Sequence, residues 1–134
     1  MQGRGVVQPL TTSSAPLRVL IVEDDESNSE VLKLVLEMGG HTAIVAATAQ
    51  EALDQAAAGR PDVVLLDLGL PDMDGREVSA SLRVTTSPAP RIIITSGTRV
   101  DAAEAARLGA DAVLEKPFDP DRLLAMLEKD KSPS

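Results

Sequence analysis

The sequence contains no cysteine, and this absence removes several kinds of chemistry at once. Disulfide bonds, thiolate metal sites and cysteine nucleophiles are excluded, and a reducing compartment is the natural setting. The single histidine, His41, excludes metal sites built from several histidines. With one phenylalanine, no tyrosine and no tryptophan, a site that stacks flat rings is not expected, and the core must be built from aliphatic side chains.

Basic residues are in the minority: 13 lysines and arginines stand against 21 aspartates and glutamates, a net charge of −8. Such a charge repels phosphate backbones, so we expect no direct binding to nucleic acid. No apolar run approaches the roughly 20 residues that cross a bilayer, and the N-terminus lacks the basic and apolar segments of a signal peptide. We therefore expect a cytoplasmic protein that does not contact a membrane.

The chain length suits one domain. Residues 1–16 mix Gly, Pro, Ser and Thr without periodicity, which predicts a flexible leader, and residues 129–134 are expected to form a C-terminal tail. Between residues 17 and 128, short β-branched runs alternate with helical segments, a pattern typical of a parallel α/β sheet. The expected strands are Arg18–Val22, Thr42–Val45, Val63–Leu66, Arg91–Thr95 and Ala112–Leu114.

The intervening helices are marked at both ends. An N-cap side chain three residues before a glutamate, the capping-box spacing, occurs at Ser27 and Glu30, Thr48 and Glu51, and Asp101 and Glu104. Glycines that offer a left-handed C-cap follow three helices, at Gly39, Gly59 and Gly109. Asp119 before Pro120 predicts the start of the last helix. The prediction is five parallel strands and five helices, joined by right-handed crossovers.

Two expected strands run directly into acidic residues. Glu23 and Asp24 follow the first strand, and Asp67 follows the third. In an open doubly wound sheet of order 2-1-3-4-5, these two strands are neighbours, and ligands bind outside their carboxyl ends. We therefore expect the three carboxylates to converge on one crevice.

Carboxylates in one crevice repel one another unless a positive charge lies between them, and a hard cation is the simplest remedy. Mg²⁺ prefers six oxygen ligands and keeps several waters, so carboxylates, a backbone carbonyl and a phosphate oxygen would complete its shell. The turn after Asp67 offers the carbonyl of Gly69, whose missing side chain leaves the approach open. The predicted Mg²⁺ ligands are Glu23, Asp24, Asp67 and the Gly69 carbonyl.

The other strand ends add a hydroxyl and an ammonium group. Thr95 and Ser96 end the fourth strand, and Lys116 follows the fifth. A metal cation on one side, with a lysine and a hydroxyl on the other, would form a pocket for a tetrahedral dianion bonded to Asp67. Phosphoryl transfer to a carboxylate needs an in-line nucleophile and charge neutralisation more than acid–base groups. His41, expected at the surface or in a turn, is therefore not required.

Each of these residues has an ordinary explanation when taken alone. An aspartate at a strand end often caps a turn, neighbouring acids often form a solvated loop, and a lone lysine is usually an exposed surface cation. The coincidence of the acids and Lys116 at the ends of several strands of one predicted sheet favours a functional site instead. The bond between Lys116 and Pro117 is a candidate for the cis form, which only X-Pro bonds adopt at tolerable cost.

From about Leu17 to Glu128 the chain resembles the response-regulator receiver family of two-component signalling. The segment 19–25 (VLIVEDD) is similar to the family's first strand and acidic pair, the segment 65–75 (LLDLGLPDMDG) to its phosphoacceptor turn, and the segment 116–118 (KPF) to its lysine motif. The resemblance implies a single-domain, flavodoxin-like receiver that acts as a phosphoacceptor rather than an enzyme, apart from promoting its own phosphotransfer and dephosphorylation.

The resemblance also implies roles for the site residues. Asp67 would be phosphorylated by a histidine kinase or a histidine phosphotransfer protein, Glu23 and Asp24 would hold Mg²⁺, and Lys116 would contact the phosphoryl oxygens. Either Thr95 or Ser96 fits the family's hydroxyl residue. Thr95 is preferred because it follows Pro90 at the usual distance.

The sequence says less about how such a domain would pass its signal to an output protein. An aromatic residue is common in the family three residues before the lysine, and Val113 stands there, so we expect the response to centre on the loop after the fourth strand. The face of helix 4, strand 5 and helix 5 is the expected surface for an unknown output protein. Two alternatives remain: a degenerate receiver that only binds proteins, which the complete acid and lysine set disfavours, and a flavodoxin-like cofactor binder, which the scarcity of aromatic residues disfavours.

Overall fold

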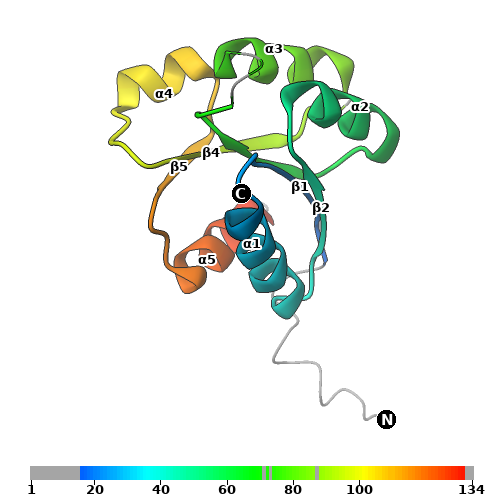
Figure 1. The fold of residues 1–134 in the computed structure, drawn as a ribbon, viewed down its shortest axis with the longest axis vertical. Helices are drawn as coiled ribbons and strands as arrows, with labels where there is room; N and C mark the ends of the chain where they lie inside the picture. The colour runs from blue at the N-terminus through cyan, green and yellow to red at the C-terminus, as the bar shows by residue number, and fades with distance from the viewer. Residues whose placement is uncertain (1–15, 71, 73, 87, 132–134) are drawn as a thin grey trace.

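The computed structural model describes residues 16–131 except residues 71, 73 and 87. Strands and helices alternate along the chain (Figure 1) in the order β1 (Arg18–Val22), α1 (Glu26–Met38), β2 (Thr42–Ala46), α2 (Ala49–Gly59), β3 (Val63–Asp67), α3 (Gly75–Thr85), β4 (Arg91–Ser96), α4 (Ala102–Leu108), β5 (Ala112–Glu115) and α5 (Pro120–Lys131). All strand pairs are parallel, and the sheet order is β2-β1-β3-β4-β5. The predicted fold is confirmed.

The core forms two layers, one on each face of the sheet. Figure 1 shows α1 and α5 on one face and α2, α3 and α4 on the other. Alternate residues of β3 enter the two layers: Val63 and Leu65 pack with α1 and α5, whereas Val64 and Leu66 pack with α2 and α3. Because both faces are covered, the central strands are near-continuous apolar runs, as the sequence pattern required.

Four of the five strands extend one residue beyond their predicted ends, to Ala46, Asp67, Ser96 and Glu115. The added residues continue the parallel register, in which Asp67 pairs with Thr95 and Ser96 pairs with Glu115. Asp67 is therefore the last residue of β3, held by the sheet itself.

The helix starts agree with the sequence at three of four predicted positions. Thr48 and Asp101 cap α2 and α4, and Asp119 precedes α5 as expected. The prediction for α1 was wrong, because the N-cap is Asp25. Its carboxylate accepts hydrogen bonds from the Ser27 and Asn28 N–H groups at 2.9 and 3.2 Å, so the helix starts earlier and Ser27 lies in its first turn.

The helix ends agree less well. Gly109 takes the left-handed conformation that was predicted, with φ of 74°. Gly39 has φ of −84°, and the positive φ falls on Gly40 instead. Gly59 is the last residue of α2, and Arg60 carries the left-handed C-cap with φ of 46°. The guanidinium of Arg18 donates to the Gly59 carbonyl, a contact between distant segments that no local pattern reveals.

His41 was expected at the surface or in a turn; it directly follows the turn at residues 39–40, and the surface alternative is wrong. Its ring is buried, and Nδ1 accepts a hydrogen bond from the Leu17 N–H at 3.0 Å. Of the expected leader, residues 1–15 lie outside the described part, as do residues 132–134 of the expected tail, and α5 runs to Lys131. The Lys116-Pro117 bond is cis. No helix within the described residues is long and apolar enough to cross a membrane.

The loop after β3 is tied to the start of α2 by Asp72. Its carboxylate accepts hydrogen bonds from the Ala49 N–H at 3.0 Å and from the Gln50 N–H at 3.4 Å. The bond from Ala49 is the main cause that lowers the pKa of Asp72 below its ordinary value of 3.8. An anion at a helix N-terminus is favourable because it meets unpaired N–H groups and the positive end of the helix dipole.

We expect Asp72→Ala to lower the free energy of unfolding at neutral pH, with a deficit that shrinks on acidification. A carboxylate whose pKa is depressed on folding contributes stability above its ordinary pKa of 3.8 and loses it as the pH falls through the folded-state value. Urea unfolding at a series of pH values measures this. Asp72→Asn keeps an acceptor oxygen but not the charge, so it should retain part of the stability without the pH dependence. An Asp72→Ala deficit that is constant with pH would contradict this role.

Candidate functional site

The site lies at the carboxyl ends of the strands, where Lys116 joins two acids. Lys116 follows β5, and its Nζ lies 3.2 Å from Glu23 Oε1 and 3.2 Å from Asp67 Oδ1. Glu23 follows β1 and is 3% exposed, and Asp67 ends β3 and is 8% exposed. A single ammonium group therefore contacts two buried carboxylates supplied by two other strands and offsets part of their charge.

A third acid completes the group. One carboxylate oxygen from each of Glu23, Asp24 and Asp67 lies within 4.8 Å of the others. Asp24 is exposed, so the cluster opens to solvent on its side. An all-oxygen donor set with an open side fits a hard divalent cation such as Mg²⁺, which retains water ligands. The structure thus brings together the three acids that the sequence analysis placed in one crevice.

The charges in this cluster affect one another. Burial raises the pKa of Glu23 above its ordinary value of 4.5, and the charge of Asp67 acts in the same direction, whereas hydrogen bonds from the Asp25 N–H and Lys116 lower it. Burial acts to lower the pKa of Lys116, but hydrogen bonds to both acids outweigh it, so this pKa lies above its usual value. Lys116 therefore stays charged at neutral pH.

The two candidate hydroxyls lie on opposite faces of β4. Thr95 pairs in register with Asp67, and paired residues of parallel strands point to the same face, so Thr95 shares the face of the phosphoacceptor candidate. Ser96 points to the other face, where its Oγ donates to the Thr98 carbonyl at 2.8 Å and accepts from the Thr98 N–H at 3.0 Å. The register favours Thr95 over Ser96.

Gly69 lies against the Asp67 carboxylate. A Cβ at this position would lie 3.6 Å from Asp67 Oδ2 and 3.9 Å from Oδ1, so the missing side chain leaves this side of the carboxylate uncovered. The metal-binding role of the Gly69 carbonyl stays a prediction. In the motif that follows, Pro71 and Met73 lie outside the described residues.

Two residues that support the site were not assigned from the sequence. Asp25 caps α1, and its N–H donates to Glu23 Oε2 at 3.2 Å, which orients that carboxylate. Asp72 fastens the loop that follows β3. A local signal existed for Asp25, an aspartate just ahead of a helical segment, but the contact between Asp72 and α2 spans 23 residues and has no local signature.

Five parallel strands in this order, with an acidic cluster and a lysine at their carboxyl ends, define a receiver-type α/β domain. The model of the family described as "Response regulator receiver domain" matches residues 19–128, and the chain belongs to this family of two-component signalling domains.

Relatives and solved structures agree with this assignment. "Response regulator MprA" of Mycolicibacterium vanbaalenii is 39% identical over 113 residues, which cover 84% of this chain and 49% of that protein. "Uncharacterized transcriptional regulatory protein YkoG" of Bacillus subtilis is 39% identical over 110 residues, 81% of this chain and 48% of that protein. The chain thus spans about half the length of these relatives.

Among solved structures, a response regulator receiver domain (CheY-like) from Methylobacillus flagellatus has a TM-score of 0.79 and 31% identity, covering 87% of this chain and all of that one. The chemotaxis response regulator CheY4 of Vibrio cholerae has a TM-score of 0.78 and 28% identity, covering 87% of this chain and 99% of that one.

We expect Lys116→Met to destabilise the fold at neutral pH, because Glu23 and Asp67 would then be buried together without a counter-charge. Acidification should reduce the deficit. The pKa of Glu23, already raised on folding, would rise further, so the folded state would bind more protons than the unfolded state and gain stability as the pH falls.

Urea unfolding at neutral and mildly acidic pH measures the effect. Arg122→Met, which removes an exposed cation from α5, is the matched control for net charge. Equal stability of Lys116→Met and the control at neutral pH would show that the ammonium does not offset the two acids.

Proposed function

We propose that the chain is a phosphoacceptor and that Asp67 accepts the phosphoryl group. The phosphodonor would be a phosphohistidine of a histidine kinase or of a histidine phosphotransfer protein. The observation that carries the proposal is the position of Lys116 Nζ, 3.2 Å from both Glu23 and Asp67, beside the three-carboxylate group. Such an arrangement has a nucleophile, a fixed cation and a place for a second cation, which are the main requirements of phosphoryl transfer.

The two oxygens of Asp67 are differently placed. Oδ1 accepts a hydrogen bond from Lys116, and Oδ2 lies nearer to the uncovered side at Gly69. In the proposed transfer, a carboxylate oxygen forms a bond to phosphorus while the bond from phosphorus to the donor imidazole nitrogen breaks, and the electron pair leaves with the imidazole. Lys116 is positioned to neutralise charge on the transferred group.

Mg²⁺, held by Glu23, Asp24, Asp67 and the Gly69 carbonyl, would supply the remaining positive charge when bound. No general base is required, because a carboxylate oxygen attacks phosphorus without giving up a proton. The same arrangement would let the domain promote its own phosphotransfer, and later its own dephosphorylation by water. The chain itself would therefore contribute positioning and charge rather than acid–base chemistry.

Output is proposed to pass through the loops after β4 and β5. The Lys116 N–H donates to the Ser96 carbonyl at 2.7 Å, and the Leu68 N–H donates to the Thr95 carbonyl at 3.2 Å, so the end of β4 is bonded to both neighbouring loops. Val100 of the loop after β4, Val113 of β5 and Phe118 of the loop after β5 help to line a hollow of about 480 Å³. A shift of either loop would reshape this hollow, which suits it to a partner protein that recognises the phosphorylated state.

We expect incubation with acetyl phosphate and Mg²⁺ to add the mass of one phosphoryl group to the wild-type chain and nothing to Asp67→Asn, because an amide is a poor nucleophile. Intact-protein mass spectrometry measures this. Asp54→Asn, an exposed acid on α2, is the matched control and should be labelled like the wild type. Full labelling of Asp67→Asn would refute the assignment.

The metal ligands are tested in the same assay. Asp24→Ala should raise the Mg²⁺ concentration needed for half-maximal labelling, because it removes one of three clustered carboxylates. Glu30→Ala on α1 removes an equal charge outside the cluster and should have a much smaller effect. Equal Mg²⁺ requirements for the two variants would place Asp24 outside the metal site.

We expect Thr95→Ala to be phosphorylated almost normally but to lose the conformational response. Phosphorylation adds close to two negative charges and three acceptor oxygens, and a hydroxyl on the face of Asp67 can bond to them by moving inward. Amide exchange with and without the phosphoryl mimic beryllofluoride should show protection changes at residues 97–104 in the wild type and in Thr95→Ser, but not in Thr95→Ala. If Ser96→Ala abolishes these changes while Thr95→Ala does not, the roles of the two hydroxyls are reversed.

A further inference from the structure

Among the residues that the structure describes, no strand covers the outer edge of β2. The Thr42 N–H donates to the Leu17 carbonyl at 2.9 Å, and the Ala46 carbonyl accepts from the Glu23 N–H at 3.0 Å, so both residues bond toward β1. Along a parallel strand, successive residues direct their N–H and C=O groups to alternate sides. Ala43 and Val45 therefore direct theirs outward, where β2 ends the sheet and no strand among the described residues pairs with it (Figure 1).

This edge lacks the features that usually prevent pairing with another chain. Charged residues and prolines commonly protect exposed edges. No charged residue or proline lies between Glu37 and Glu51, a span that contains all of β2 and its flanking turns. The opposite edge strand, β5, ends in Glu115 and is followed by Lys116 and Pro117. Within the described residues the two edges of the sheet are therefore unequal, because β2 has no charged residue or proline and β5 is flanked by both.

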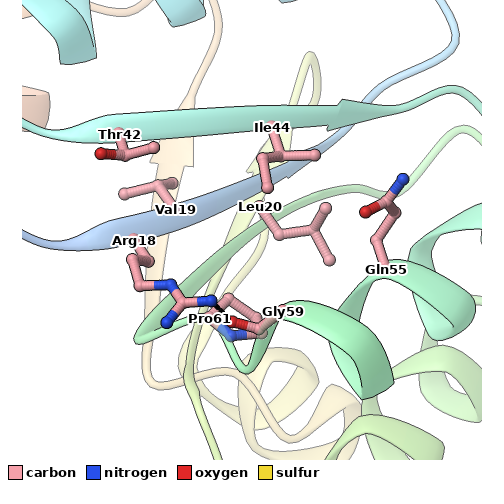
Figure 2. Close-up of a pocket in the computed structure, with 8 residues that line it drawn as sticks. All are labelled: Arg18, Val19, Leu20, Thr42, Ile44, Gln55, Gly59 and Pro61. Carbon is pink, nitrogen blue, oxygen red and sulfur yellow. Dashed lines mark hydrogen bonds between the residues drawn. The ribbon is translucent and has the colours of Figure 1, made fainter.

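An apolar side chain accompanies the free backbone groups. Ile44, at the centre of β2, is 41% exposed. Figure 2 shows Ile44 of β2 beside Leu20 of β1 and Thr42 of β2 beside Val19, with Gln55 reaching from α2. These residues, with Arg18 and Pro61, line a small hollow of about 30 Å³. The edge thus combines hydrogen-bonding groups with an incompletely covered apolar surface.

We propose that β2 pairs with β2 of a second copy of this chain, antiparallel, about a two-fold axis between the two Ile44 residues. Ala43 of one copy then faces Val45 of the other, and each such pair exchanges both N–H···O=C bonds. Ile44 faces Ile44 of the second copy at the intervening position without backbone bonds, where the Cβ atoms of a pair lie about 4.5–5.5 Å apart. The two five-stranded sheets become one continuous sheet.

A second copy suits this edge because the edge is self-complementary. The two-fold axis pairs each outward donor with an acceptor, and like charges are not opposed across the pair because the span is uncharged. Two molecules of net charge −8 repel at long range, and salt screens that repulsion. Association through this edge should therefore strengthen as ionic strength rises, opposite to a dimer held by ion pairs.

The proposed dimer does not depend on the function of Asp67. β2 and β5 are opposite edges of the sheet, so the face of α4, β5 and α5 remains free in the dimer. Asp67 lies at the end of β3, separated from β2 by β1. The interaction surface would therefore add self-association to the chain while leaving the proposed output face open.

A disulfide trap tests the geometry. The chain has no cysteine, so Ile44→Cys introduces the only thiol, and the separation expected across the two-fold axis is near that of bonded cysteines. Val84→Cys, at an 81% exposed position on α3, is the matched control. Under mild oxidation we expect Ile44→Cys to form a covalent dimer several-fold faster than the control, with the difference growing at higher salt. Equal rates would indicate random collisions and overturn the proposal.

A second experiment uses the chain without cysteine. Sedimentation velocity should show a weak dimer that increases with protein concentration and salt. Ile44→Lys should abolish it, and Val84→Lys, which changes the net charge equally, should not. Amide exchange of the wild type at increasing protein concentration should protect Ala43 and Val45 but not Thr42 or Ile44, which already face β1.

Three results would overturn the proposal. The first is a chain that stays monomeric at every protein and salt concentration. This includes the case in which the Ala43 and Val45 amides become protected only when an extended peptide is added. The second is a dimer that survives Ile44→Lys. The third is a dimer whose formation protects amides elsewhere but not those of Ala43 and Val45.

Discussion

The site depends on one contact, that of the Lys116 ammonium with the two buried acids Glu23 and Asp67. Removing two carboxylates from water is costly, and their mutual repulsion adds to that cost unless a cation lies between them. Lys116 supplies that cation from β5, on the far side of β4 from β3. The contact therefore joins the ends of three strands and leaves a partly neutralised carboxylate group whose donor set fits a further cation.

The sheet supplies the geometry that this contact needs. Parallel strands bring all their carboxyl ends to one edge, so residues far apart in sequence become neighbours without long loops. Asp67 is held by its pairing with Thr95 of β4, and Glu23 is oriented by the N–H of Asp25 at the start of α1. Because the acids are fixed by strands and a helix start, their mutual distances depend little on the more exposed connections around them.

Much of this arrangement could be predicted from the sequence because it follows from periodicity. Apolar runs located the five strands, and acids placed directly after two of them implied a common crevice. The choice between Thr95 and Ser96 could not be made from the residues alone, because adjacent hydroxyls look alike until the register with β3 assigns each to a face. Similarity to the family's motifs narrowed that choice by alignment, and the register gives a physical reason for the same preference.

The failed predictions have other causes, two of them contacts between distant segments and one a choice between neighbouring caps. The burial of His41 depends on the Leu17 N–H, 24 residues away, and the left-handed end of α2 at Arg60 accompanies a contact between Arg18 and Gly59. The start of α1 was misassigned because Asp25 and Ser27 are both good N-caps, and the short connection from β1 decides between them. Local patterns identify the elements, whereas contacts between distant segments decide how the elements end.

The position of Asp67 within β3 has a consequence for how a signal is encoded. All five residues of β3 are buried, and the strand is paired on both sides, so we expect it to open only when the whole domain unfolds. Thr98 and Gly69, by contrast, are exposed residues of connecting loops. Asp67, the phosphoacceptor candidate, would therefore keep its position, and the signal would consist of a displacement of the exposed loops relative to it. How reliably a partner distinguishes the two states would then depend on how widely these loops fluctuate rather than on any movement of Asp67.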